Sequence, residues 1–189
     1  FSSAHAALTF AFNYSAQAVE RPMMARMADK GGGSGKGLGG LDGAGQAGMI
    51  LSKVKSLSRL HQAIFRARFG ERVAKCPCCG SPADDLEWLS AIRVISDHAV
   101  AAALSSHLTS RLLRDAIVAR YFGKKVLLHE VAERVGVSSS TASNHNSKII
   151  RWLRGTNSQI NGSSNSLLGE EPLAMLAISE LLSAGGVCP

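Results

Sequence analysis

The chain has 189 residues, 46% of them apolar, and a formal net charge of +7 at pH 7. This apolar fraction excludes a fully disordered chain. Aromatic residues make up only 5%, so the core must consist mainly of aliphatic side chains, which favours packed helices over a β-sandwich. We therefore predict a mainly α protein with one domain, or one domain with flexible attachments.

Basic residues are confined to the part of the chain that ends at Arg154. That part holds all 21 Lys and Arg and 11 acidic residues, a balance of +10, whereas residues 155–189 contain three glutamates and no base. A basic body indicates a polyanionic partner, most often nucleic acid; the alternative is a protein that is basic without such a partner. No segment is long and apolar enough to span a membrane, so we expect a cytoplasmic protein with no membrane partner.

The N-terminal region is predicted to be a helical segment over residues 1–30 followed by a glycine-rich loop over 31–48. Apolar residues share one side of a helix over residues 4–29: Leu8, Phe12 and Val19. Pro22 must kink or restart this helix. Ten of the 18 residues from 31 to 48 are glycine, which disfavours a packed helix throughout.

Residues 49–109 are predicted to be a basic helical body. Apolar residues recur at spacings of three and four over 49–69: Ile50, Val54, Leu57, Leu60 and Ile64. The exposed side of this helix is expected to be strongly basic: Lys53, Lys55, Arg59, Arg66, Arg68 and Arg72. Asp84 or Asp85 is a candidate N-cap for the next helix, whose apolar positions are Leu86, Leu89, Ile92 and Val94.

A cysteine-rich turn over residues 76–80 interrupts this body. Cys76 and Cys79 form a Cys-x-x-Cys pair, and proline and glycine let the backbone fold so that both thiolates meet one ion. A closed zinc site needs four ligands. Cys78 is the candidate third ligand, and His61 or His98 the fourth. The alternative is a simple turn with free thiols; four cysteines, three of them clustered, do not make a disulfide framework.

Residues 110–154 are predicted to be a helix-turn-helix DNA-binding region. A first helix over 108–121 has Leu112, Leu113, Ala116 and Ile117 on one side and ends at Gly123. Then the segment 127–154 has small, glycine and apolar residues at the positions that two crossing helices require. On the first helix of this pair Val131 and Val135 face inward, and Ala132 is small because the second helix crosses close to it. Gly136 permits the left-handed backbone of the turn, Val137 fills the core beside it and Ser138 is a natural N-cap.

The second helix of this pair is predicted to have a buried inner side and a DNA-binding outer side. The inner residues are Ala142, His145, Ile149, Trp152 and Leu153. The outer residues are Ser139, Ser140, Ser143, Asn144, Ser147, Lys148 and Arg151. Small polar side chains at the start of such a helix approach base edges, Asn144 suits adenine, and Lys148 and Arg151 suit phosphates.

Residues 155–189 are predicted to be a flexible linker, over 155–166, and a short acidic tail helix. The linker is rich in Ser, Asn and Gly. The helix has Leu173, Leu176, Ala177 and Leu181 on one side, and it either docks on the body, binds a partner or stays loose. No segment alternates with a period of two over a sustained run, so no sheet is expected.

Residues 114–122 and 128–153 resemble region 4 of sigma factors, with no gap from Glu130 onward. A free-standing copy on a small basic chain is similar to the Q-type antitermination proteins of lambdoid and related phages. Other stretches similar to that group lie at residues 8–12, 21–23 and 37–48, and in the cysteine turn followed by Glu87 and Trp88.

The resemblance implies a phage transcription regulator in the bacterial host cytoplasm. Such proteins bind double-stranded DNA near a late promoter, load onto RNA polymerase and promote read-through of terminators. The alternatives are a conventional helix-turn-helix repressor or activator, and an adaptor whose helix pair contacts protein. No catalytic constellation is evident, so we expect no enzymatic activity, no small-molecule substrate and no cofactor except zinc.

Overall fold

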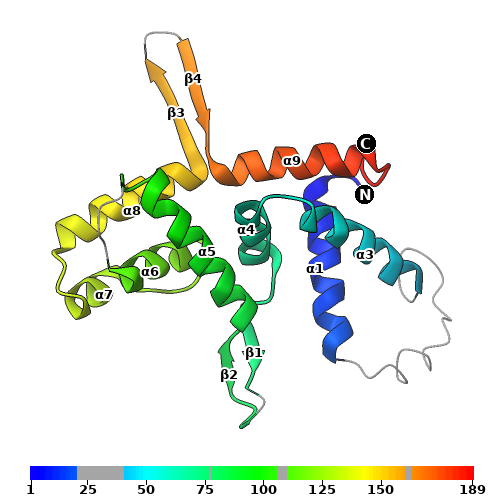
Figure 1. The fold of residues 1–189 in the computed structure, drawn as a ribbon, viewed down its shortest axis with the longest axis horizontal. Coiled ribbons are helices and arrows are strands. Elements are labelled where there is room, and N and C mark those ends of the chain that lie inside the picture. Colours follow the sequence, from blue (N-terminus) through cyan, green and yellow to red (C-terminus); the bar gives the residue numbers. More distant parts are fainter. Residues whose placement is uncertain (21–40, 77, 106–109, 161–162) are drawn as a thin grey trace.

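The computed structural model describes residues 1–20, 41–76, 78–105, 110–160 and 163–189, without the side chains of 15–20, 41–42, 157–160 and 163–166. Within these ranges the chain is mainly helical, as predicted (Figure 1). The first half comprises α1 (Ala4–Glu20), α3 (Leu41–Lys55), α4 (Arg59–Phe69), β1 (Val73–Lys75), β2 (Pro82–Asp84) and α5 (Leu86–Ala102). The second half comprises α6 (Arg111–Tyr121), α7 (Leu128–Arg134), α8 (Ser139–Arg154), β3 (Gly155–Ile160), β4 (Ser163–Leu168) and α9 (Glu170–Ala184).

One continuous, mainly aliphatic core connects these helices. Helix α4 packs against α5, and α6 packs against α5, α7 and α8. Trp88 is fully buried between α4 and α5, and its indole N–H donates to the carbonyl oxygen of Ala67 at 3.2 Å. Helix α9 runs across one side of the molecule and contacts α1, α3, α4 and α8 (Figure 1). The last helix of the chain therefore joins the N-terminal helices to α8.

The predicted N-terminal helix is present as α1, and Leu8 and Phe12 are buried as expected. The predictions for Val19, for residues 21–30 and for 31–40 lie outside what the structure describes. The predicted loop over 31–48 is wrong from Leu41 onward, because α3 begins there. Ala47, Ile50 and Val54 are buried along α3, and a Cβ on Gly45 or Gly48 would contact nothing. Burial of one apolar side thus outweighs the low helix propensity of these exposed glycines.

The single helix predicted over 49–69 is divided into α3 and α4. The Ser56 hydroxyl donates to the carbonyl oxygen of Lys53 at 2.7 Å, which favours a turn over a continued helix. Ser58 then begins α4, because its hydroxyl oxygen accepts a hydrogen bond from the His61 N–H at 3.2 Å. Two serines between apolar positions are the local cause of this break.

The buried sides of α5 and α6 differ in part from the prediction. Asp85 rather than Asp84 caps α5, accepting from the Trp88 N–H at 2.8 Å. Leu113 and Ile117 on α6 are fully buried as predicted, but Leu86 is 80% exposed and Leu112 is 62% exposed. Ile92 is buried as one of the predicted apolar positions of α5. The rest of its buried side comprises Trp88, Ala91, Ile95, Ser96 and Ala99.

Two antiparallel ribbons correct the prediction that the chain has no sheet. The first pairs β1 with β2, from Val73 opposite Asp84 to Lys75 opposite Pro82. The second pairs β3 with β4, from Gly155 opposite Leu168 to Ile160 opposite Ser163. The second ribbon occupies most of the segment predicted to be a flexible linker. Its polar composition lacks the apolar alternation that marks a half-buried strand, so the sequence contains no signal for it.

The predicted tail helix is present as α9, and it docks on the body. Its buried side is the row Ala174, Ile178 and Leu182, each fully buried. Leu173 and Leu176, which were predicted to lie on the apolar side of this helix, are 40% and 51% exposed. No described helix combines the length and the apolar character that crossing a membrane requires.

Candidate nucleic-acid interface

A tight turn around Gly136 joins α7 to α8. Gly136 has a φ of +69°, which is the left-handed conformation that glycine adopts without strain. The Gly136 N–H donates to the Glu133 carbonyl at 3.1 Å, and the Val137 N–H donates to the Ala132 carbonyl at 2.9 Å. Ala132 is 1% exposed. The small side chain and the positive φ lie at the positions that the sequence predicted for them.

Helix α8 begins at the predicted cap and buries the predicted inner side. The Ser138 hydroxyl oxygen accepts a hydrogen bond from the Thr141 N–H at 3.2 Å. Ala142, Ile149 and Leu153 are buried, and His145 and Trp152 are half-buried. These contacts with α6 and α7 fix the rotation of α8 about its own axis.

The outer side of α8 is exposed at all seven positions predicted to contact DNA. They are Ser139, Ser140, Ser143, Asn144, Ser147, Lys148 and Arg151. No acidic residue occurs in α8, and neither Lys148 nor Arg151 forms an ion pair with any described residue. The Ser147 hydroxyl donates to the Ser143 carbonyl at 3.0 Å. The outer side is thus small and polar at the N-terminal end and cationic toward the C-terminal end.

The predicted basic side of residues 53–72 is not one continuous cationic surface. Arg66 pairs with Asp85 and Glu87, both at 2.9 Å, and Arg72 donates to the Gly123 carbonyl at 2.8 Å. Burial raises the pKa of Asp85, but the Trp88 N–H and the Arg66 guanidinium outweigh it and hold that pKa below its usual range. Three of the six predicted cations, namely Arg66, Arg68 and Arg72, thus hold elements together. Lys55 and Arg59 remain exposed, with no ion pair in the described part of the chain.

Glu171 is a residue that the sequence did not single out. Its carboxylate accepts two hydrogen bonds from Arg68, at 2.6 and 2.8 Å, and one from the Tyr121 hydroxyl. It therefore links α9 to both α4 and α6. Burial and this hydrogen bond raise the pKa of Tyr121 to about 12. Burial alone lowers the pKa of Arg68, but Glu171 outweighs it and raises that pKa above its usual value.

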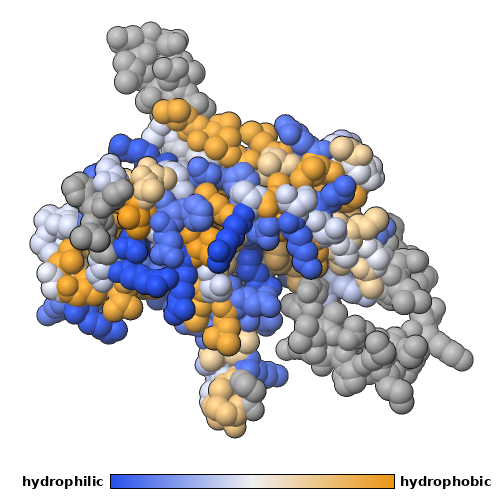
Figure 2. Space-filling view, viewed as in Figure 1, coloured by the Kyte–Doolittle hydropathy of each residue, from blue (hydrophilic) through white to orange (hydrophobic). Residues whose placement is uncertain are grey.

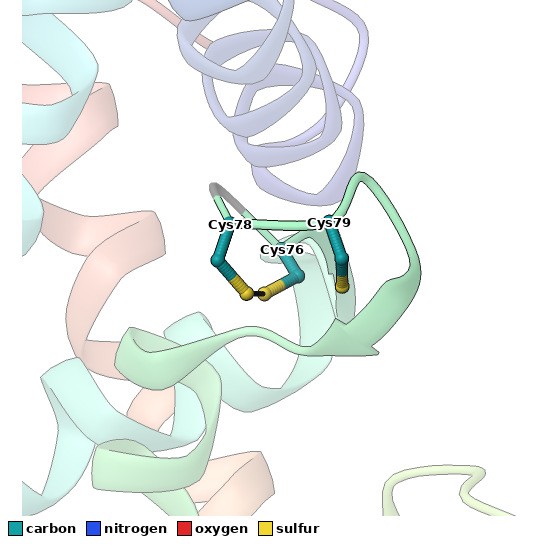
Figure 3. Close-up of side chains that lie close together, drawn as sticks. All are labelled: Cys76, Cys78 and Cys79. Carbon is teal, nitrogen blue, oxygen red and sulfur yellow. Dashed lines mark hydrogen bonds between the residues drawn. The ribbon is translucent and has the colours of Figure 1, made fainter.

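The three clustered cysteines lie at the tip of ribbon β1–β2 (Figure 3). The Gly80 N–H donates to the Cys76 carbonyl at 2.8 Å, and Gly80 has a φ of +70°. The sulfur atoms of Cys76, Cys78 and Cys79 all lie within 4.8 Å of one another. Those of Cys76 and Cys78 are 2.9 Å apart. Three neighbouring sulfur ligands are a donor set that can hold a metal ion.

The two histidines predicted as fourth ligands do not belong to this cluster. The His61 Nε2 lies 3.6 Å from a Glu170 carboxylate oxygen on α9. The His98 Nδ1 lies 2.8 Å from the Val94 carbonyl oxygen within α5. Within the described part of the chain, no fourth histidine, cysteine or acidic residue joins the three sulfur atoms at this spacing.

Neighbouring groups shift the pKa values of these three thiols. The Ser81 hydroxyl, 3.1 Å from the sulfur, and the Ser81 N–H lower the pKa of Cys79 to about 7. The hydrogen bond between Cys76 and Cys78 lowers the pKa of the Cys76 thiol and raises that of Cys78. A lowered thiol pKa favours the thiolate, which is the form that binds metals.

No protein-family model, curated protein or solved structure matches the chain.

Proposed function

We propose that this chain is a sequence-specific DNA-binding regulator of transcription, with α7 and α8 acting as a helix-turn-helix. The observation that carries the proposal is the two-sided character of α8. Its inner side is buried against α6 and α7, while all seven outer residues are exposed without an acidic neighbour in the same helix. Small polar and cationic side chains on one exposed helix side suit the major groove and its flanking phosphates.

The outer residues divide into two roles in this proposal. Ser139, Ser140 and Ser143 are short enough to let the helix approach base edges, and Asn144 forms a bidentate pair with adenine. Lys148 and Arg151 neutralise backbone phosphates. Because the N-terminal part of this surface has no arginine, a large share of the affinity is electrostatic and depends on salt.

The role that we propose within transcription is antitermination. It is supported by the resemblance to region 4 of sigma factors and to Q-type antitermination proteins. In this role the chain binds near a phage late promoter, engages bacterial RNA polymerase in the host cytoplasm and promotes read-through of terminators.

Transcription with purified host RNA polymerase tests this role. The template carries the nearest late promoter of the native locus and a downstream terminator. The proposal predicts more RNA extending past the terminator at unchanged initiation. A uniform loss or gain of all transcripts would instead indicate a repressor or activator. No effect of the protein would contradict a direct role in transcription and would favour an adaptor.

A pair of double variants separates the proposed DNA contact from general charge. Lys148→Ala/Arg151→Ala removes two cations from the outer side of α8. Lys55→Ala/Arg59→Ala removes the same two residue types from exposed positions at the α3–α4 junction. We expect the first variant to lose read-through and the second to keep it. Equal activity of both variants would count against α8 as the DNA-binding element.

We further propose that Cys76, Cys78 and Cys79 bind zinc. The support is the three sulfur atoms within 4.8 Å of one another, which provide three of the four ligands of a tetrahedral site. Bound zinc would cross-link the tip of ribbon β1–β2. We expect about one zinc ion per chain, by the usual stoichiometry of such sites, in elemental analysis of the purified protein. Cys76→Ser/Cys79→Ser should abolish zinc binding. Cys188→Ser, which alters the buried cysteine near the C-terminus, should leave the zinc content unchanged.

A further inference from the structure

Three of the four cysteines lie at the tip of ribbon β1–β2, where a small reagent in solution can reach them. The ribbon projects from the helical body (Figure 1), and Figure 2 shows its tip standing clear of the helices. Cys78 and Cys79 are exposed and Cys76 is half-buried, whereas Cys188 is buried. Accessible thiols beside one another are the usual sites of reversible oxidation.

The three sulfur atoms of the cluster are not equivalent. Those of Cys76 and Cys78 point toward each other and lie 2.9 Å apart (Figure 3). The Cys79 sulfur does not point at this pair, and it lies 3.1 Å from the Ser81 hydroxyl oxygen. A disulfide bond is about 2.05 Å long, so the Cys76 and Cys78 sulfur atoms need to approach by less than about 1 Å.

Backbone hydrogen bonds close the turn that carries these thiols. The Cys76 N–H donates to the Ser81 carbonyl, and the Gly80 N–H donates to the Cys76 carbonyl, both at 2.8 Å. The pairing of Lys75 with Pro82 continues the ribbon directly from this turn. The fold therefore holds two thiols close together before any bond joins them, which is the proximity that makes an intramolecular reaction fast.

We propose that Cys76 and Cys78 form a reversible thiol–disulfide site, and that their oxidation by a low-molecular-weight disulfide releases the metal ion. The release rests on the zinc site proposed above, whereas the disulfide does not. Thiolates bind metals and a disulfide contains none. Oxidation would leave Cys79 as the last of the three sulfur ligands, too few for a tetrahedral zinc site.

The reaction consists of two thiol–disulfide exchanges. First, the exposed Cys78 sulfur attacks the external disulfide and breaks its S–S bond, and one external thiol leaves with the Cys78 proton. The Cys76 sulfur then attacks the Cys78 sulfur of this mixed disulfide, and the second external thiol leaves with the Cys76 proton. Two protein thiols are thus oxidised, and one external disulfide is reduced to two thiols. An excess of external thiol reverses both exchanges.

Timed oxidation of the full chain by glutathione disulfide, with and without bound zinc, tests this proposal. Free thiols are alkylated with one reagent, and thiols released by later reduction are alkylated with a second. Trypsin cleaves after Lys75 and Arg93 and leaves residues 76–93 as one peptide, in which mass spectrometry locates each label. We expect the first disulfide to join Cys76 to Cys78 in both samples. Zinc, followed with a chelating dye, should leave the loaded chain in step with this bond.

Single serine variants separate the three thiols. Cys79→Ser should form the disulfide at the rate of the unaltered chain. Cys78→Ser should oxidise more slowly by about tenfold or more, because the remaining pair has lost the close sulfur contact. Cys188→Ser is the matched control, since it removes a thiol outside the cluster, and it should behave as the unaltered chain does.

The proposal is overturned if the first disulfide contains Cys79, if a mixed disulfide with glutathione persists, or if the bond joins two chains. An unchanged oxidation rate in Cys78→Ser would also overturn it. A chain that forms the Cys76–Cys78 bond but binds no zinc in its reduced form would refute the zinc site and support the disulfide. Zinc that stays bound after complete oxidation would overturn the proposed release.

Discussion

Glu171 lies in the first turn of α9 and receives hydrogen bonds from Arg68 on α4 and Tyr121 on α6. The Arg68 guanidinium also lies over the rings of Tyr121 and Phe122, at 5.5 and 5.1 Å from their centroids. One carboxylate thus connects three helices that are far apart in the sequence. Glu180 on the same helix is exposed and forms no ion pair with a described residue, which makes it a suitable control.

Removal of the Glu171 carboxylate should destabilise the fold. We expect Glu171→Ala to lower the free energy of unfolding by about 2 kcal/mol, the range for hydrogen bonds to charged groups. Urea denaturation followed by circular dichroism measures the change. Glu180→Ala should change the same quantity by less than about 0.5 kcal/mol. Similar values for the two variants would show that the Arg68–Glu171–Tyr121 contacts do not contribute to stability.

The raised pKa of the Tyr121 hydroxyl predicts that the fold loses stability in strong alkali. Its pKa in the folded chain is raised to about 12, so the folded state holds this proton more tightly than the unfolded state does. The resulting contribution to stability is fully present below about pH 10 and is lost as the pH rises through about 12. An ultraviolet titration of tyrosinate, taken as the difference between the unaltered chain and Tyr121→Phe, should have a midpoint near 12. A midpoint near 10, the ordinary value, would contradict this account.

A helix could be predicted from the sequence where the spacing of its apolar residues and a capping residue indicate the same helix. Ser138, Gly136 and the inner side of α8 follow this rule, whereas α6 buries Leu113 and Ile117 without a side-chain cap. The predicted sides are wrong where Leu86 and Leu112 lie outside, because helical spacing alone does not decide which of two adjacent apolar rows meets the body. The ribbons could not be predicted, because neither contains a sustained apolar alternation and their strand conformation comes from backbone pairing.

Substitution of Gly136 tests the turn between α7 and α8. A Cβ at this position would contact nothing, so the cost of Gly136→Ala arises only from the positive φ. We expect a loss of about 1–2 kcal/mol in the free energy of unfolding, the cost of the left-handed conformation for an L-residue. Gly45→Ala is the matched control, because a Cβ there also contacts nothing but the residue lies within α3. It should be neutral or stabilise the chain by up to about 1 kcal/mol. A loss of stability in Gly45→Ala equal to that in Gly136→Ala would contradict the conformational explanation.

At the scale of the whole molecule, α9 connects the first and last thirds of the fold. It packs on α1, α3, α4 and α8, and the Phe1 nitrogen donates to the Val187 carbonyl at 2.9 Å. The helix itself was predictable from its leucines. Its contacts with the other helices could not be predicted. The buried side of α9 is the row Ala174, Ile178 and Leu182, and only the positions of the other helices determine which row is covered. The long-range pairs of Glu171 were unpredictable for the same reason.

The candidate site was more predictable than the tertiary arrangement around it. All residues of the proposed DNA-binding surface belong to one helix, so periodicity and the preceding turn are enough to separate its two sides. The cysteine cluster is likewise local, since its three members lie within four consecutive residues. Neither feature depends on the distant contacts that decide the packing of α9.

The salt dependence of DNA binding tests the central claim, that the outer side of α8 binds DNA, most directly. Fluorescence anisotropy with a labelled duplex from the late-promoter region of the native locus gives the affinity at a series of salt concentrations. Each cation on a phosphate contributes about one to the slope of log affinity against log salt. The account predicts that Lys148→Ala/Arg151→Ala binds more weakly and with a slope reduced by about two, while Lys55→Ala/Arg59→Ala retains the slope of the unaltered chain. An unchanged slope in the α8 variant, or no binding of the unaltered chain to the duplex, would contradict it.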